Sequence, residues 1–131
     1  MLELGKSYFE HLGIDRKDKE TRQKNLLQNF EFFGAPTVLL FFMDKSMGYW
    51  PTLDLGILVG TMMIEIQNEG LGSIAQAALA GYPDVIRKEL NINPNWNVAL
   101  GMSLGYIDES AHINSFRSTR ASNSENIIFF E

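Results

Sequence analysis

Two arginines near the C-terminus have the side chains and the spacing of a phosphate-binding pair. Arg117 and Arg120 lie three residues apart and are the only lysine or arginine residues after Lys88. Guanidinium groups bind phosphate through charge-assisted, often bidentate hydrogen bonds. The segment is therefore either a phosphate clamp or an exposed tail whose charges serve solubility, and the residue types alone leave both interpretations open.

The segment "GLGSIAQAALAGYPDVIRKEL", residues 70–90, contains few large side chains before its proline. Three neighbours suit such a segment: a phosphate, a closely packed helix, or a flat aromatic ligand contacted through backbone groups. The two glycines around Leu71 are not a dinucleotide fingerprint, because the remaining glycine pattern and the ribose-binding acid are missing. A close-packed turn before a helix at Pro83 is the simpler alternative.

The usual catalytic constellations are absent or weak. No serine lies in a strand–turn–helix elbow with a glycine on each side, and Glu65 and Glu69 more simply meet solvent at a helix end. The lack of cysteine excludes disulfides and thiolate chemistry. His11 and His112 are the only histidines and have no second ligand at metal-binding spacing, so we expect no metal site.

Composition and charge define the broad class. A chain of 131 residues, 45% hydrophobic and 21% charged, fits one folded domain over 1–131. The net charge of −5 and the lack of a basic stripe argue against a nucleic-acid partner. The most apolar runs are too short or too interrupted to cross a membrane, and residues 1–13 lack signal-peptide features. We therefore expect a cytoplasmic protein with no membrane partner.

Hydrophobic spacing predicts the elements that must position these residues. Apolar residues at every third or fourth position predict a helix over 17–33 that ends at Gly34. A short apolar run predicts a buried strand over 36–44. Strict alternation over 96–106 predicts a strand with one bulky face and one face of small residues, against which a helix is the simplest neighbour.

The longest helix is expected over 51–70, with Thr52 as its cap and Gly70 as its stop. This helix is apolar nearly all round, so a second surface must cover part of it. Gly56 and Gly60 leave a flat strip for a second subunit, although ordinary packing within one subunit is equally compatible with the pattern.

The C-terminal segment "ENIIFFE", residues 125–131, has strand-forming residues and follows a polar, loop-like stretch. An unpaired segment of this kind in water favours aggregation. We therefore expect it to add a strand to a sheet, either that of its own chain or that of a second subunit.

Taken in order, five segments resemble the later part of the nitroreductase family of FMN-dependent oxidoreductases. The resemblance covers essentially the whole chain and is most specific over residues 50–130. It implies an α+β fold in which helices flank a mixed, mostly antiparallel sheet, with 111–131 as a C-terminal extension. The segments are "FFGAPTVLLFFMD", "YWPTLDLGILVGTMM", "EGLGSIAQAALAGYPDVIRKELNI", "VALGMSLGY" and "INSFRSTRASNSENIIFFE".

The resemblance also implies an assembly and a reaction. Family members are homodimers that bind two FMN molecules between subunits, and their C-terminal segment extends the partner's sheet. NAD(P)H reduces FMN by hydride transfer, and the reduced flavin then reduces a second substrate, often a nitroaromatic compound or a quinone. The flavin carries the chemistry, so no catalytic side chain is expected.

The same resemblance assigns site residues by position. A backbone N–H of Ala77 or Ala78 reaches the N5 edge of the flavin, and Arg120 binds the FMN phosphate with Arg117 as a second contact. Tyr49 and Trp50 form part of the substrate-pocket wall. The full set of implied cofactor-binding residues is Ala75, Gln76, Ala77, Ala78, Arg117 and Arg120.

One departure from the family pattern concerns its beginning. Family members normally start with a helix that carries an arginine–arginine–serine motif, followed by a segment with a flavin-contacting asparagine, and neither is found here. The sequence thus resembles a nitroreductase without its first part. Three hypotheses follow: a flavoenzyme, a non-catalytic dimeric scaffold that has lost strong FMN binding, and an incomplete nitroreductase complemented by another chain.

Overall fold

The computed structural model describes residues 2–130 and divides them into two compact units. The residues up to 23 and those from 108 onward form one unit, which we call the terminal unit. Residues 24–107 form the other, which we call the sheet unit. The expectation of one domain over 1–131 stays a prediction.

The sheet unit is built on three antiparallel strands. The central strand β3 (Trp96–Gly105) pairs with β1 (Thr37–Asp44) on one side and with β2 (Gly72–Gln76) on the other. The strands predicted over 36–44 and 96–106 are therefore confirmed within a residue of each end. The strand β2 was not predicted, because its sequence "GSIAQ" has little strand propensity of its own.

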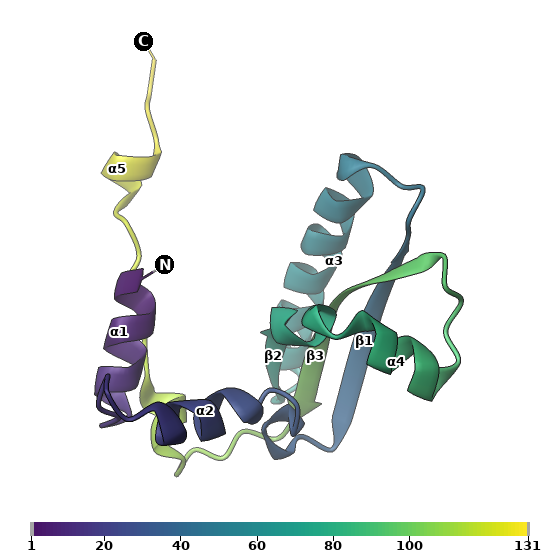
Figure 1. Ribbon diagram of the computed structural model, residues 1–131. Coiled ribbons are helices and arrows are strands. Elements are labelled where there is room, and N and C mark those ends of the chain that lie inside the picture. The colour runs from purple at the N-terminus through teal and green to yellow at the C-terminus, as the bar shows by residue number, and fades with distance from the viewer. Residues whose placement is uncertain (1, 131) are drawn as a thin grey trace. The chain divides into compact units, whose positions relative to one another are not determined.

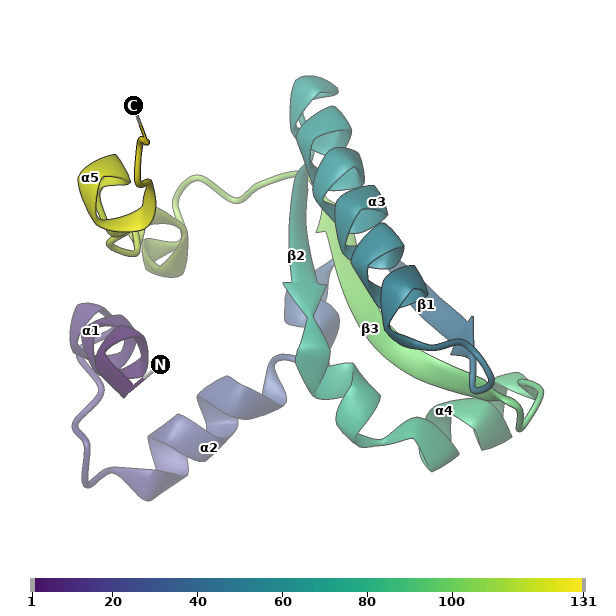
Figure 2. The same cartoon turned by 90° about the horizontal axis from the view of Figure 1, so that it is seen from above.

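Helices and turns cover both faces of this sheet. Helix α3 (Tyr49–Asn68) lies along one face, while the 3-10 turn η2 (Ala77–Gly81) and helix α4 (Pro83–Leu90) lie on the other (Figure 1, Figure 2). The expected α+β class, with helices flanking an antiparallel sheet, is confirmed.

The core surrounds the middle of β3. Met102 is completely buried, and Val59 from α3 and Leu79 from η2 are also buried. Neighbouring residues of a strand point to opposite faces, so Met102 and Gly101 face opposite sides of the sheet. The sheet is thus covered on both faces at its centre. The buried Leu79 fixes the position of η2 on one of these faces.

A β-bulge breaks the alternation that the sequence predicts for β3. Phe41 lies opposite Leu100, but Phe42 lies opposite Val98, so Ala99 is an extra residue on β3. Leu40 and Phe42 lie on the same face of β1. Residues that pair across two strands also lie on the same face, and Leu40 pairs with Gly101 while Phe42 pairs with Val98. Val98 therefore lies on the face of small residues, and the prediction of one bulky face over the whole strand is wrong.

Helix α3 begins earlier than predicted. Gly48 is its N-cap and no side chain caps it, so the prediction of Thr52 as the cap is wrong. Pro51 lies in the first turn, where the N–H that proline lacks would have no acceptor in the helix. Gly70 adopts a positive φ of 76° just after the helix, which confirms it as the stop.

One face of α3 remains uncovered by the described residues. Val59 is its buried residue, whereas Ile57, Leu58 and Ile64 are each more than half exposed. A Cβ added at Gly60 would meet no atom within 4 Å beyond its chain neighbours and the adjacent backbone of the helix. The second surface expected for α3 stays a prediction.

None of the helices in residues 2–130 combines the length and the apolar character that a membrane span requires.

The helix predicted over 17–33 is shorter than expected. Helix α2 spans Lys19–Leu27, and a short 3-10 turn, η1 (Phe32–Gly34), follows it. Phe32 and Phe33 have positive φ angles of 54° and 53°, and Gly34 one of 74°. Local spacing does not reveal this turn, because bulky residues avoid positive φ unless tertiary contacts hold them there.

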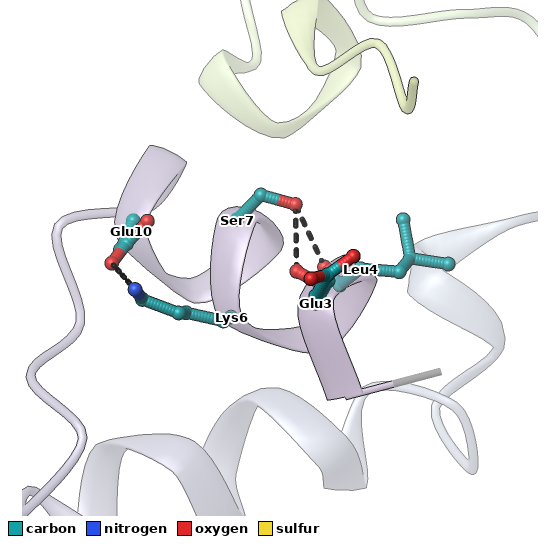
Figure 3. Close-up of polar contacts among 5 residues, drawn as sticks. All are labelled: Glu3, Leu4, Lys6, Ser7 and Glu10. Carbon is teal, nitrogen blue, oxygen red and sulfur yellow. Dashed lines mark hydrogen bonds and ion pairs between the residues drawn. The ribbon is translucent and has the colours of Figure 1, made fainter. Parts of the chain in front are cut away.

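In the terminal unit, helix α1 (Leu2–His11) is supported by contacts along its own surface (Figure 3). The Ser7 hydroxyl donates to the Glu3 carbonyl at 3.1 Å, and Lys6 Nζ lies 3.7 Å from Glu10 Oε1. Both contacts are local, so they stabilise the helix without determining what it packs against.

A histidine pair joins α1 to the short turn η3 (His112–Ser115) within the same unit. His112 Nε2 donates to the His11 carbonyl at 2.8 Å, and His11 Nε2 lies 3.2 Å from the His112 carbonyl. The two rings stack with centroids 4.3 Å apart. Carbonyl oxygens only accept, so Nε2 of each ring is the donor in these two contacts. The two histidines, distant in sequence, thus serve as a structural link.

The C-terminal segment has no strand assignment in the described chain. After a short helix α5 (Asn123–Asn126), residues 127–130 are extended without a strand partner in the described chain. Phe129 and Phe130 are 86% and 90% exposed. The addition of this segment to a sheet, either that of its own chain or that of a second subunit, stays a prediction.

The turn after β1 gives a pH-dependent prediction. The Ser46 hydroxyl, at 2.6 Å, and its backbone N–H, at 2.8 Å, donate to Asp44 Oδ1 and hold the pKa of Asp44 below its usual value. The stabilisation is therefore present above the unfolded pKa and is lost as pH falls through the folded one. Ser46→Ala is expected to raise the Asp44 pKa in a carboxyl NMR titration, whereas Ser7→Ala leaves it unchanged. An identical Asp44 titration in Ser46→Ala would contradict this assignment.

Candidate functional site

The alanine-rich segment alternates between exposed and buried residues. Gln76, the last residue of β2, and Leu79, in η2, are buried, whereas Ala75, Ala77 and Ala78 are exposed. The exposed members end at Cβ, so a planar ligand can approach the backbone closely there. The first N–H groups of a 3-10 turn have no acceptor within the turn, which leaves those of Ala77 and Ala78 as donors for such a ligand.

Leu79 fixes this segment to the central strand. Its side chain is only 4% exposed, and an ideal Cβ built at Gly101 would lie 2.2 Å from Leu79 Cδ1. Gly101 therefore leaves the space that Leu79 fills. The expected neighbour of the small-residue face is thus a 3-10 turn with one leucine, where a regular helix was predicted.

The Gln76 side chain points into the protein. Its Nε2 donates to the Asn29 carbonyl at 2.8 Å, and its Oε1 accepts from the Ser103 hydroxyl at 2.5 Å. Gln76 and Ser103 are each 2% exposed. Only the backbone of Gln76 is left to contact a ligand. A contact between this backbone and the cofactor stays a prediction. Sequence reasoning missed the roles of Asn29 and Ser103, because nothing local marks them as partners.

Tyr49 and Trp50 form an exposed aromatic pair in the first turn of α3. Each is 72% exposed, and their rings meet edge to face with centroids 5.6 Å apart. Exposed aromatic faces can stack on planar ligands. Their place in the wall of a substrate pocket stays a prediction.

The two candidate phosphate ligands lie in the terminal unit. Arg117 Nη1 donates to the carbonyls of Asn114 and Phe116, at 2.8 and 2.9 Å. Arg120 Nη1 donates to the Thr119 carbonyl at 3.0 Å and also contacts the Ser118 hydroxyl.

Both guanidiniums keep capacity for a further ligand. Arg117 and Arg120 are exposed, and within residues 2–130 neither forms an ion pair with a carboxylate. Nε and Nη2 of each side chain are left as donors after the contacts through Nη1. The phosphate-clamp interpretation stays a prediction, because local contacts of this kind are also compatible with a solvated tail.

The residues present fit an FMN molecule in two respects. The isoalloxazine ring needs a backbone surface without large side chains, and the exposed alanines at 75, 77 and 78 provide one. The FMN phosphate needs cationic donors, and the exposed arginines at 117 and 120, which form no ion pair within residues 2–130, provide them. The two groups lie in different units of the structure.

Comparison with known sequences identifies relatives over most of the chain. The profile described as "Nitroreductase family" matches residues 3–106. The chain is 34% identical to 4-nitrobenzoate reductase of Pseudomonas putida, over 88% of this chain and 51% of that protein. It is 32% identical to nitroreductase NfnB of Mycolicibacterium smegmatis, over 97% of this chain and 54% of that protein.

Solved structures agree with this result. The FMN-dependent nitroreductase NfnB from Mycobacterium smegmatis, crystallised with NADPH, matches 99% of this chain and 58% of its own with a TM-score of 0.94 and 32% identity. The FMN- and NADPH-dependent NfnB from sphigopyxis sp. strain HMH matches the same shares with a TM-score of 0.95 and 29% identity. The chain spans about half the length of the curated relatives it matches. On its sequence and its fold, this chain belongs to the nitroreductase family.

Proposed function

We propose that this chain takes part in the FMN-dependent reduction of nitroaromatic compounds, with NAD(P)H as the reductant. The observation that carries the proposal is the alanine segment. Its exposed residues have no side chain beyond Cβ, and its residues Gln76 and Leu79 are buried in the protein. When bound, FMN supplies the chemistry of accepting and donating a hydride. The names of the relatives, among them a nitrobenzene nitroreductase and a chloronitrobenzene nitroreductase, support a nitroaromatic acceptor.

Each predicted site residue has a role in this proposal. The backbone N–H of Ala77 or Ala78 donates to the N5 edge of the flavin, and Ala75 and the Gln76 backbone lie beside it. Arg120 binds the FMN phosphate, with Arg117 as a second contact. Tyr49 and Trp50 form part of the acceptor pocket, where a flat ring can stack. Quinones, which also have a flat ring, are a second class of acceptor that such a pocket suits.

The proposal includes a homodimer in the cytoplasm. The uncovered face of α3 and the exposed apolar residues at 127–130 support two surfaces of association, one helical and one formed by the C-terminal segment. Large exposed apolar patches are typical of interaction sites. We propose that the C-terminal segment adds a strand to the partner's sheet, and that residues 111–131 act as an extension of a single nitroreductase-like domain.

A visible absorption spectrum tests the proposal most directly. The protein is incubated with excess FMN and then dialysed. Bound oxidised flavin is expected to leave absorption bands at about 370 and 450 nm. Anaerobic NADPH is then expected to bleach the 450 nm band, and a nitroaromatic acceptor to restore it. A colourless protein after dialysis would reject FMN binding by this chain alone and favour the scaffold or the complemented-chain hypothesis.

Arg120→Ala tests the phosphate assignment. A charge-assisted hydrogen bond contributes about 1.5–3 kcal/mol, so the FMN dissociation constant is expected to rise about 10- to 100-fold in a fluorescence titration. Lys88→Ala removes an exposed charge elsewhere and is expected to leave it unchanged. Unaltered affinity in Arg120→Ala would remove Arg120 from the site.

A further inference from the structure

Gln76 and Ser103 are the buried polar side chains of the described chain, and they contact each other. The Ser103 hydroxyl donates to Gln76 Oε1, which turns the amide so that Nε2 faces the Asn29 carbonyl. In a buried site such a network is stable only when every member has its partner. The pair therefore joins β3, the end of β2 and the segment after α2.

The residue on the other side of η2 contacts the same segment. Tyr82 follows η2 directly, and its ring meets Phe30 edge to face with centroids 5.2 Å apart and an interplanar angle of 84°. Gln76 precedes η2 directly and contacts Asn29. The two ends of the alanine turn are thus held by two consecutive residues, while Leu79 fixes its middle against Gly101.

The contacted segment is itself strained. Phe32 and Phe33 follow within four residues of Asn29 and Phe30, and both have positive φ. Such residues are strained and persist only where surrounding contacts determine the backbone. The contacts of Gln76 and Tyr82 are long-range contacts made directly beside this strained turn.

We propose that Gln76 is a positioning residue: through Asn29 and Ser103 it holds the alanine turn so that the N–H groups of Ala77 and Ala78 face the flavin. The inference rests on the proposed function, because it gives that turn the flavin as its ligand. Gln76 does not touch the cofactor through its side chain, since both ends of its amide are bonded inside the protein. It acts by keeping the backbone in its binding conformation before FMN arrives.

Gln76→Met tests this role with nearly the same volume and without hydrogen bonds. In the cofactor-free full chain, amide hydrogen exchange over 77–82 and 29–34 is expected to become about tenfold faster, the factor for one lost hydrogen bond. The FMN dissociation constant is expected to rise by a similar factor, with a shifted 450 nm band. Gln23→Met, at an exposed position of α2, is the matched control and is expected to change none of these.

Gln76→Glu provides a second test, in which low pH is expected to restore slow exchange. A side chain that only filled space would not give this pH dependence. A charged carboxylate cannot donate to the Asn29 carbonyl, but a protonated one can, and burial favours the protonated form. Slow exchange over 77–82 is therefore expected to return as pH is lowered from about 8 to about 5, after correction for intrinsic rates. Ser103→Ala leaves Gln76 in place and serves where Gln76→Met fails to fold, with a smaller change in the same direction expected.

The outcomes separate the two proposals. Unchanged exchange over 77–82 in the Gln76 and Ser103 variants would overturn the positioning role, whether or not the chain binds FMN. Faster exchange with unaltered FMN affinity would overturn it as well. Failure of the unaltered protein to bind FMN would reject the proposed function, while the exchange of the cofactor-free chain would still decide whether Gln76 holds the turn.

Discussion

Gly101→Ala is expected to destabilise the protein by about 1–3 kcal/mol, the range for overpacking a filled core. The new Cβ would lie 2.2 Å from Leu79 Cδ1 and 3.3 Å from Leu40 Cδ2. Leu79 is buried and cannot simply swing into solvent, so the alanine turn must shift away from β3. Urea unfolding of the cofactor-free protein measures the loss.

A double variant shows whether Leu79 is the cause. Leu79→Ala alone is expected to cost about 2–5 kcal/mol, because it leaves a cavity. In the double variant, the smaller side chain at 79 removes the clash and the new methyl group at 101 fills part of the cavity. Its loss of unfolding free energy is therefore expected to be about 0.5–3 kcal/mol smaller than the sum of the losses in the two single variants. Gly5→Ala, in the open interior of α1, is the control and is expected to gain about 0.5–1 kcal/mol. Simple additivity would contradict the contact.

Removal of the apolar character of the C-terminal segment is expected to weaken the proposed dimer strongly. Burial of a phenylalanine contributes about 1.5–3 kcal/mol, and two such residues per chain act twice in a symmetric dimer. The variant Phe129→Ser with Phe130→Ser is therefore expected to raise the dimer dissociation constant by at least about 100-fold, measured by sedimentation equilibrium.

A control and a second readout accompany this variant. Leu26→Ser replaces an apolar residue of α2 that is 57% exposed and is expected to leave the association state unchanged. Circular dichroism is expected to change little, because residues 127–130 belong to no helix or strand of the single chain. A variant that stays dimeric at nanomolar concentration would contradict strand exchange and leave the exposed face of α3 as the surface of association.

Local patterns predicted the elements whose residues carry their own signal. The strand over 36–44 follows from a short apolar run between a proline and a charged turn, and the helix at 83 from its proline. The stop at Gly70 follows from a backbone conformation that glycine adopts with least strain. These features depend on residues that are neighbours in sequence, so the sequence contains the information in readable form.

Features that depend on distant partners were not predicted. β2 forms because Gly72–Gln76 pairs with the small-residue part of β3, and its own residues favour no strand. The bulge at Ala99 exists only in the register with β1. The inward orientation of Gln76 depends on a carbonyl 47 residues away in sequence. For the candidate site, residue types and family resemblance indicated the surface, whereas only the structure reveals what holds it in place.

The strand order β1-β3-β2 has a consequence for synthesis on the ribosome. β1 and β2 do not pair with each other, and both depend on β3, which is the last of the three strands in the chain. A nascent chain that has emerged only as far as β2 therefore exposes two unpaired strands and the apolar helix α3 between them. Because this sheet is completed only by its final strand, we expect the growing chain to be prone to aggregation until residue 105 has left the exit tunnel.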